Sequence, residues 1–272
     1  MEKLFFDGLK ISHAVDEKPS NKDFLLHVHD DYEILCVVSG RVGYRVEGRE
    51  YDLSRGSIMI MRRAEIHRLI VKETTKYERF IINFSPELLE KYGFDASILD
   101  AYDKRALGSK NQYLPSDLSG IDPVGFLTQM SATLEATPNE GIAVAYTVAL
   151  LGAINAAFYE KNASLAKPRD AFEERIVDYI NEHILDDISL PDISEAMNLS
   201  VSQLNRVFNR MTGVSVYNYI VSKRLVYAKG MISRGESAIN ACTSCGFKDY
   251  SSFFRLYKKR FGVSPSGGQK KN

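Results

Sequence analysis

The chain has 272 residues, of which 44% are hydrophobic and 26% charged, a composition typical of an ordinary globular protein long enough for two domains. Three cysteines, an odd number, argue against a disulfide framework, and the first residues lack the apolar run of a signal peptide, so we expect a cytoplasmic protein. Lys and Arg equal Asp and Glu at 35 each, yet residues 198–272 hold 13 basic and 2 acidic residues. Such localised positive charge favours phosphate binding.

Short strands are predicted in the first third of the chain. Residues 1–22 are mostly polar and predict an extended arm. From about Phe24 to Phe84, runs rich in β-branched and aromatic residues alternate with glycine or charged turns, which predicts a β-sandwich or a small barrel. The expected strands are residues 32–38, 43–46, 58–61, 67–71 and 77–84.

Within this region, the pattern His27-x-His29-x-x-x-Glu33, with His67 further on, is similar to the two motifs of the cupin barrel. The first three positions are all odd, so in a strand-like segment they share one face. Three imidazoles and one carboxylate suit Fe, Mn, Ni or Zn, but the same groups can line a ligand site or form structural hydrogen bonds. We favour a ligand-lining role and expect neither a metal nor a cofactor.

A small barrel has room for one small molecule. Tyr44 and Arg45 are further candidates for its wall, although strand alternation places only one of the two inside. The candidate effector-pocket residues are His27, His29, Glu33, Tyr44, Arg45 and His67.

Helical patterns follow from Pro86. Residues 141–159 carry no charge, a stretch long enough to span a membrane. Its Ala and Gly content and the lack of flanking basic clusters favour instead a helix buried by its neighbours or by a second subunit. The expected helices are residues 86–92, 96–102, 122–136, 140–161, 172–184 and 216–232.

The same short pattern occurs twice near the end of the chain. Residues 200–208 align with residues 249–257, and the match continues into Gly-Val-Ser after each segment. Each copy predicts a short helix, a tight turn and a second helix, which is the helix-turn-helix unit of DNA-binding proteins. Ser200 and Asp249 are placed to cap the second helices, and Gly213 and Gly262 to end them.

The C-terminal hundred residues resemble the DNA-binding domain of AraC-type bacterial transcription regulators. The most specific match is the run from Phe253 through Tyr257-Lys-Lys-Arg-Phe-Gly-Val-Ser to Pro265. The resemblance implies a cupin-like sensor barrel, a helical dimer interface and no enzymatic activity. Between the two halves, residues 163–170, which include Pro168, are the expected linker.

The chain departs from the family pattern in its second repeat. Ala238, Ala241, Cys242 and Cys245 stand where larger apolar residues are usual, and the stretch after Pro265 lacks the usual aromatic and basic ending. Both departures predict a second unit that is less well packed and holds DNA less tightly. Cys242-x-x-Cys245 has no second ligand pair, so we expect no zinc or redox chemistry there.

The outer face of each recognition helix is expected to meet the DNA. Arg suits guanine, Asn suits adenine, and Phe254 could touch a thymine methyl. Five residues occupy positions that contact bases in the family, and Phe254 is added because it lies on the same outer face. The expected base contacts are Ser202, Asn205, Arg206, Ser251, Phe254 and Arg255. The expected phosphate contacts are Arg210, Lys223, Arg224, Lys258, Lys259 and Arg260.

The predicted fold is α+β and multidomain. It comprises an arm and cupin-like β-barrel (1–84), a helical dimerisation segment (85–162), a linker (163–170) and an all-α double helix-turn-helix domain (171–272). We expect a bacterial, nucleoid-associated, ligand-responsive and sequence-specific regulator of carbohydrate or small-metabolite genes. Its expected partners are duplex DNA, a small effector such as a sugar, a second copy of the chain and, for an activator, RNA polymerase, with no membrane partner.

The sequence is also compatible with two other functions. The first is a metal-dependent cupin enzyme with an accessory basic domain, which bound Fe or Mn would favour. The second is a constitutive DNA-binding protein whose barrel serves only dimerisation.

Overall fold

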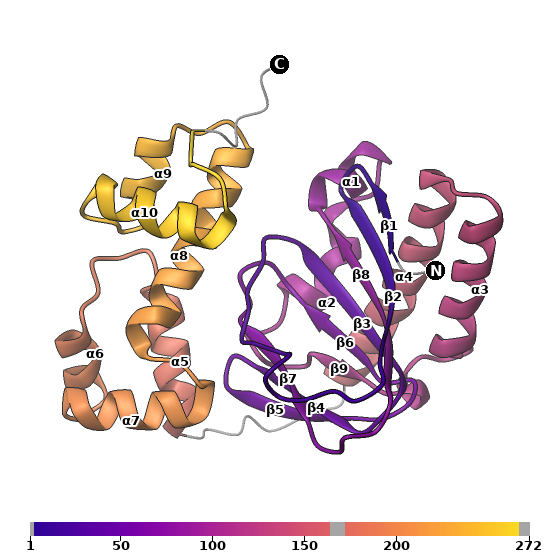
Figure 1. Ribbon diagram of the computed structural model, residues 1–272, viewed down its shortest axis with the longest axis horizontal. Helices are drawn as coiled ribbons and strands as arrows, with labels where there is room; N and C mark the ends of the chain where they lie inside the picture. The colour runs from indigo at the N-terminus through magenta and orange to yellow at the C-terminus, as the bar shows by residue number, and fades with distance from the viewer. Residues whose placement is uncertain (1–2, 164–171, 267–272) are drawn as a thin grey trace. The chain divides into compact units, whose positions relative to one another are not determined.

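The computed structural model describes residues 3–163 and 172–266, which form two compact units (Figure 1). One unit holds the strands and helices α1–α4, and the other holds helices α5–α10. Apart from Ala163, the linker expected at 163–170 lies outside the described residues, as do the residues after Ser266.

The first unit contains two antiparallel sheets. The larger has the strand order β1-β2-β8-β3-β6-β9, and the smaller has the order β5-β4-β7. Three of the five expected strands, β6, β7 and β8, match their predicted bounds at both ends, and the other two, β3 and β4, each differ by one residue at one end. The strands are Lys3–Phe6, Leu9–Asp16, Tyr32–Ser39, Val42–Val46, Arg49–Leu53, Ile58–Met61, His67–Val71, Tyr77–Phe84 and Gln112–Tyr113, named β1 to β9 in that order.

The N-terminal residues are part of the sheet, so the expectation of an extended arm was wrong. β1 and β2 form a hairpin around Gly8, whose φ is 77°. β2 then pairs with β8 over its whole length, and this pairing buries Leu9 and Ile11. The alternation of apolar and polar residues along β2, preceded by an Asp-Gly turn, is the signal that sequence reasoning missed.

The larger sheet is buried on both faces. Ile34 and Cys36 of β3 pack toward the helices, whereas Leu35 and Val37 pack with residues of the smaller sheet. Because successive side chains of a strand point to opposite faces, this double burial explains why β3 is almost continuously apolar. Glu33 has the parity of Leu35, so the strand directs its carboxylate toward the interior between the two sheets.

Helices cover the outer face of the larger sheet (Figure 1). The expected helix at 96–102 is a 3-10 turn, Ala96–Leu99, followed directly by a short α-helix. The α-helices of this unit are Pro86–Lys91 (α1), Asp100–Asp103 (α2), Pro123–Ala136 (α3) and Glu140–Ala163 (α4).

Helix α4 is long and apolar enough to cross a membrane by length and composition alone. One of its faces is buried against the rest of the unit, through residues that include Leu150, Ile154 and Phe158. Helices in the core of globular proteins have this character, as the sequence indicated.

The second unit is all helical. Helix α8 runs between two groups of helices, α5–α7 toward one end and α9 with α10 toward the other (Figure 1). The helices are Phe172–Glu182 (α5), Leu190–Ala196 (α6), Val201–Thr212 (α7), Val216–Ser233 (α8), Ala238–Ser244 (α9) and Tyr250–Phe261 (α10).

Candidate DNA-reading helices and effector cavity

Helix α7 begins and ends where the repeat pattern predicts. The Ser200 side chain accepts a hydrogen bond from the Gln203 amide, and the Gln203 side chain accepts one from the Ser200 amide, which forms a capping box. Gly213 ends the helix at a φ of 84°, a left-handed conformation that glycine adopts without the steric penalty of a side chain. Leu204 and Phe208 are fully buried, so the opposite face of α7 is the one open to solvent.

Helix α10 repeats this design with a different cap. The Asp249 carboxylate accepts hydrogen bonds from the amides of Ser251 (3.2 Å) and Ser252 (2.7 Å). Gly262 ends the helix at a φ of 75°, and the buried face carries Phe253 and Tyr257. In both helix-turn-helix units, the second helix therefore begins at a side-chain cap, ends at a left-handed glycine and buries one apolar face.

The expected base-contacting residues lie on the open faces of these two helices. Ser202 and Arg206 of α7 are exposed, as are Ser251 and Arg255 of α10. Asn205 and Phe254 are half-buried, and the Asn205 amide group donates to the Val201 carbonyl. Four of the six side chains are thus exposed to solvent, and the Arg255 guanidinium also donates to the Ser252 hydroxyl (3.2 Å).

Two residues expected at phosphates are buried instead, so that expectation was wrong for them. Lys223 is fully buried, and its ammonium group donates to Asn181 Oδ1 (2.6 Å) and to the Tyr219 hydroxyl (3.4 Å). Arg224 is 8% exposed. The other four, Arg210, Lys258, Lys259 and Arg260, are exposed.

Arg224 connects the two helix-turn-helix units. From the middle of α8, its guanidinium donates to the carbonyls of Ile184 (2.7 Å) and Asp186 (2.5 Å), which precede the first unit, and to that of Gly246 (2.7 Å) in the turn of the second. Burial lowers the pKa of Arg224, although the group keeps its charge. Its role is to hold loop carbonyls within the domain.

The barrel contains a cavity of about 140 Å³ between the two sheets. Three of the expected pocket residues, His27, Glu33 and Tyr44, line it, whereas His29, Arg45 and His67 are not among its lining residues. Sequence reasoning missed the remaining lining residues, and for those on β7 and β8 the inward direction depends on the register of these strands against their neighbours. These missed lining residues are Phe24, Leu35, Leu69, Tyr77, Arg79 and Ile81.

Tyr44 and Arg45 point to opposite sides of β4, as alternation requires. Tyr44 is 3% exposed, and burial first and then the nearby Glu33 carboxylate raise the pKa of its hydroxyl well above the ordinary value. The Arg45 guanidinium donates to the Glu50 carboxylate on the neighbouring strand (3.1 Å). Arg45 does not line the cavity within the described residues, so its assignment to the pocket was wrong.

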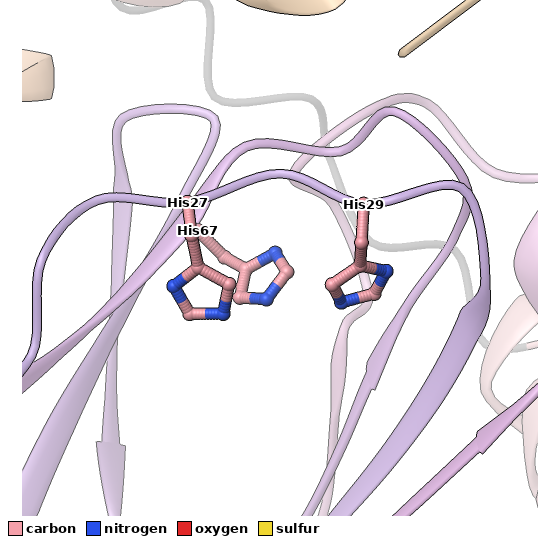
Figure 2. Close-up of side chains that lie close together, drawn as sticks. All are labelled: His27, His29 and His67. Atoms are coloured by element: carbon pink, nitrogen blue, oxygen red, sulfur yellow. The ribbon is translucent and has the colours of Figure 1, made fainter. Parts of the chain in front are cut away.

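The three histidines of the motif converge, with their side chains on the same side of the chain (Figure 2). One ring nitrogen from each lies within 4.8 Å of those from the other two. Glu33 is adjacent, with Oε1 3.9 Å from His67 Nε2, while its Oε2 accepts a hydrogen bond from the Asn83 side chain (2.8 Å). The aromatic ring of Tyr44 stacks on His67 at a centroid separation of 5.9 Å.

Tyr77 and Arg79 give the cavity an aromatic and cationic wall. The Arg79 guanidinium lies 4.6 Å from the centre of the Tyr77 ring and forms an ion pair with Asp16. The Tyr77 hydroxyl is buried and has no hydrogen-bond partner in the part of the chain that the structure describes. A buried hydroxyl in a cavity can pair with a bound ligand.

Two family models match the chain. An AraC-like ligand-binding domain matches residues 14–121, and a helix-turn-helix domain matches residues 193–271. The first spans the strands of the cavity, and the second spans both repeated units.

The chain is also similar to whole proteins over nearly its full length. It is 24% identical over 270 residues to the HTH-type transcriptional activator RhaS of Escherichia fergusonii, with 96% of this chain and 93% of that protein covered. Identity to RhaS of Escherichia coli is 22% over 274 residues, with the same coverage. Among solved structures, ToxT of Vibrio cholerae shares 16% identity at a TM-score of 0.44, covering 96% of this chain and 97% of that one.

The order of the two matched domains, a ligand-binding domain followed by a helix-turn-helix domain, is the one that the repeat and the barrel predicted. The chain belongs to the AraC family of helix-turn-helix transcription regulators.

Proposed function

We propose that this protein is a ligand-responsive, sequence-specific DNA-binding regulator of carbohydrate or small-metabolite genes. The observation that carries the proposal is the presentation of Arg206 and Arg255 on the open faces of two equivalent, capped helices. Each helix would enter a major groove, where a guanidinium can donate two hydrogen bonds to O6 and N7 of guanine. The exposed basic residues that follow would contact phosphates and set the orientation.

A selection experiment tests sequence-specific binding. Duplexes retained by the purified full-length protein from a random library should converge on a site with two conserved segments. Arg206→Ala and Arg255→Ala should each relax the preference in one segment, whereas Arg41→Ala, which removes the same charge from an exposed pair in the barrel unit, should relax neither. Equal affinity for selected and random DNA would contradict the proposal.

The cavity supports a small polar effector. Its wall combines the Glu33 carboxylate and the Arg79 guanidinium with phenol rings and aliphatic side chains, which suits a molecule with several hydroxyl groups and one apolar face. A carbohydrate fits this description. Ligand binding would shift DNA affinity only if the ligand binds the two states of the protein unequally.

The effector is tested with Tyr77→Phe, which removes only the buried hydroxyl. Thermal unfolding of the wild type is screened against sugars and related metabolites, and the ligand found is then titrated into the variant. Binding should weaken by about tenfold, the value of one hydrogen bond to an otherwise unpaired group. If no metabolite shifts the unfolding temperature, the constitutive function is favoured instead.

We also propose that the active form is a homodimer joined through α4. The exposed face of this helix carries Ala145, Ala149, Gly152 and Ala156, whose small side chains allow a second helix to approach closely. Ala149→Glu should make the protein monomeric in sedimentation experiments, and a dimer that survives this change would place the interface elsewhere. In this proposal the protein acts on DNA in the cytoplasm, contacts RNA polymerase if it activates, and has no catalytic role.

A further inference from the structure

We propose that His27, His29 and His67, with Glu33 as a fourth ligand, bind one divalent transition-metal ion beside the cavity. The proposal goes beyond the regulatory function and does not depend on it, since it concerns the chemistry of four side chains in the barrel. It runs against our expectation from the sequence, which favoured a pocket without metal.

The separation of the donor atoms is the first argument. The ring nitrogens of the three histidines lie within 4.8 Å of one another (Figure 2). An ion bound at about 2.1 Å from each nitrogen holds them about 3–4 Å apart, so small side-chain rotations would close the site. Glu33 Oε1 and His67 Nε2, 3.9 Å apart, already have the separation of two ligands on one ion.

The backbone fixes two of the donors relative to each other. The amides of His27 and His67 each donate to the other's carbonyl at 3.0 Å, which forms an isolated antiparallel bridge. Their rings lie 4.1 Å apart at an angle of 69°. The His29 carbonyl accepts a hydrogen bond from the Ala64 amide at 3.0 Å, so the third histidine also comes from a constrained segment.

Groups behind the donors orient them in the way that metal ligands are usually oriented. His27 Nδ1 donates to the Leu25 carbonyl at 3.0 Å, which places the proton of the neutral ring on Nδ1 and makes Nε2 the nitrogen that would bind an ion. The Asn83 side chain holds Glu33 through Oε2, which leaves Oε1 directed at His67. Such hydrogen bonds to ligating His and carboxylate groups fix their orientation and tautomer.

The nature of the donors selects the class of ion. Three imidazoles and one carboxylate suit Zn²⁺, Ni²⁺, Co²⁺ or Fe²⁺, whereas Ca²⁺ and Mg²⁺ prefer sets made of oxygen. The buried Glu33 carboxylate contributes a negative charge that a cation would offset. His67 is buried, but His27 is exposed, which provides a route for the ion from solvent.

The test uses untagged full-length protein, stripped with a chelator and titrated with Zn²⁺ and Ni²⁺ by calorimetry. We expect one ion per chain. The Co²⁺ form should show ligand-field absorption bands that are absent from the variants described below. Failure to bind Zn²⁺, Ni²⁺ or Co²⁺ at one equivalent overturns the proposal and favours the hydrogen-bonding or ligand-lining roles of the same residues.

The five histidines of the chain provide matched variants. His27→Ala and His29→Ala, which avoid the buried His67, should each weaken binding more than tenfold. His13→Ala and His183→Ala remove histidines that pair with Glu78 and Asp186, and should leave the affinity unchanged. Far-ultraviolet circular dichroism checks that each variant is folded.

A second outcome would also overturn the proposal. If stoichiometric binding survives in His27→Ala and His29→Ala but is lost in Cys242→Ser, the metal is held by Cys242 and Cys245. Because none of these titrations contains DNA, their failure would leave the regulatory proposal intact, and a failure to select a DNA site would leave the metal site intact.

Discussion

The two helix-turn-helix units of the C-terminal half share one design but fill their cores differently. Both recognition helices begin at a side-chain cap and end at a left-handed glycine, Gly213 in the first and Gly262 in the second. The caps differ, since Ser200 forms a reciprocal capping box and Asp249 binds two amides with one carboxylate. The two units are therefore most similar at the positions that begin and end the recognition helices. They differ more in their cores, where a large side chain on one helix can make up for a small one on its neighbour.

The small residues of α9 and of its C-cap, Cys245, do not leave the second core empty. Ala241, Cys242 and Cys245 are 0–4% exposed and pack in one cluster with Phe253 and Tyr257. Large aromatic side chains on α10 thus fill the space that small residues on α9 leave. The structure gives no support to our expectation of a less well-packed second unit, because that expectation considered one helix without its neighbour. A weaker hold on DNA stays a prediction.

The largest expected effects come from truncating matched core residues. Phe208→Ala and Phe253→Ala each remove a fully buried ring, one from each unit. Each should lower the free energy of unfolding by about 3–5 kcal/mol, measured by denaturant titration of the full chain. If the second unit were loosely packed, Phe253→Ala would cost much less than Phe208→Ala, and the account of compensating packing would be wrong.

The next effect tests whether the two units are independent. Arg224→Met keeps most of the side-chain length but removes the donors to the carbonyls of Ile184, Asp186 and Gly246. We expect a loss of about 2–4 kcal/mol of stability, since several buried acceptors lose a charged partner. Lys229→Met, which replaces a half-buried lysine of the same helix, is the control. A variant as stable as the control would show that Arg224 does not tie the units together.

A smaller effect is expected on DNA binding, and it compares the recognition helices α7 and α10 directly. On a selected site, Arg206→Ala and Arg255→Ala should each cost about 1–3 kcal/mol of binding free energy, measured by titration at one fixed salt concentration. If the second unit holds DNA less tightly, Arg255→Ala will lie at the lower end. Equal losses on selected and random DNA would assign both arginines to phosphates.

The smallest expected effect is a pH dependence of stability, which the Asp249 cap of α10 should show and a serine cap like that of α7 should not. Hydrogen bonds from Ser252 and then from the Ser251 amide hold the pKa of Asp249 below its usual range. A carboxylate with a lowered folded pKa adds stability above its unfolded pKa of about 3.9, and this stability is lost as the pH falls through the folded value. Asp249→Ser, which copies the cap of the first unit, should therefore differ less from the wild type at about pH 3 than at about pH 6. A difference independent of pH would contradict the assignment.

Much of this fold follows from local sequence signals. Caps and glycine stops predicted α7 and α10 to the residue, because the groups that satisfy a helix end lie within four positions of it. Strand β5 was missed because Arg49, Glu50 and Asp52 give it the composition of a loop. It pairs with β4 in the smaller sheet, a tertiary contact that propensity does not capture.

The candidate sites were less predictable, for physical reasons. Parity identified that only one of Tyr44 and Arg45 could face the cavity, but the inward direction of Tyr77 and Arg79 depends on how β8 pairs with β3. The charge pattern alone could not distinguish the buried Arg224 from the exposed Lys258. The carbonyls that accept hydrogen bonds from Arg224 belong to segments 22 to 40 residues away in the chain.

The most direct test of the account is a hydroxyl-radical footprint of the full-length protein on a selected duplex. Two recognition helices in adjacent major grooves predict two protected patches about 10 base pairs apart for each protein chain, with one patch weakened in Arg206→Ala and the other in Arg255→Ala. A single patch per chain that both variants weaken together would contradict the claim that the repeated units read DNA separately.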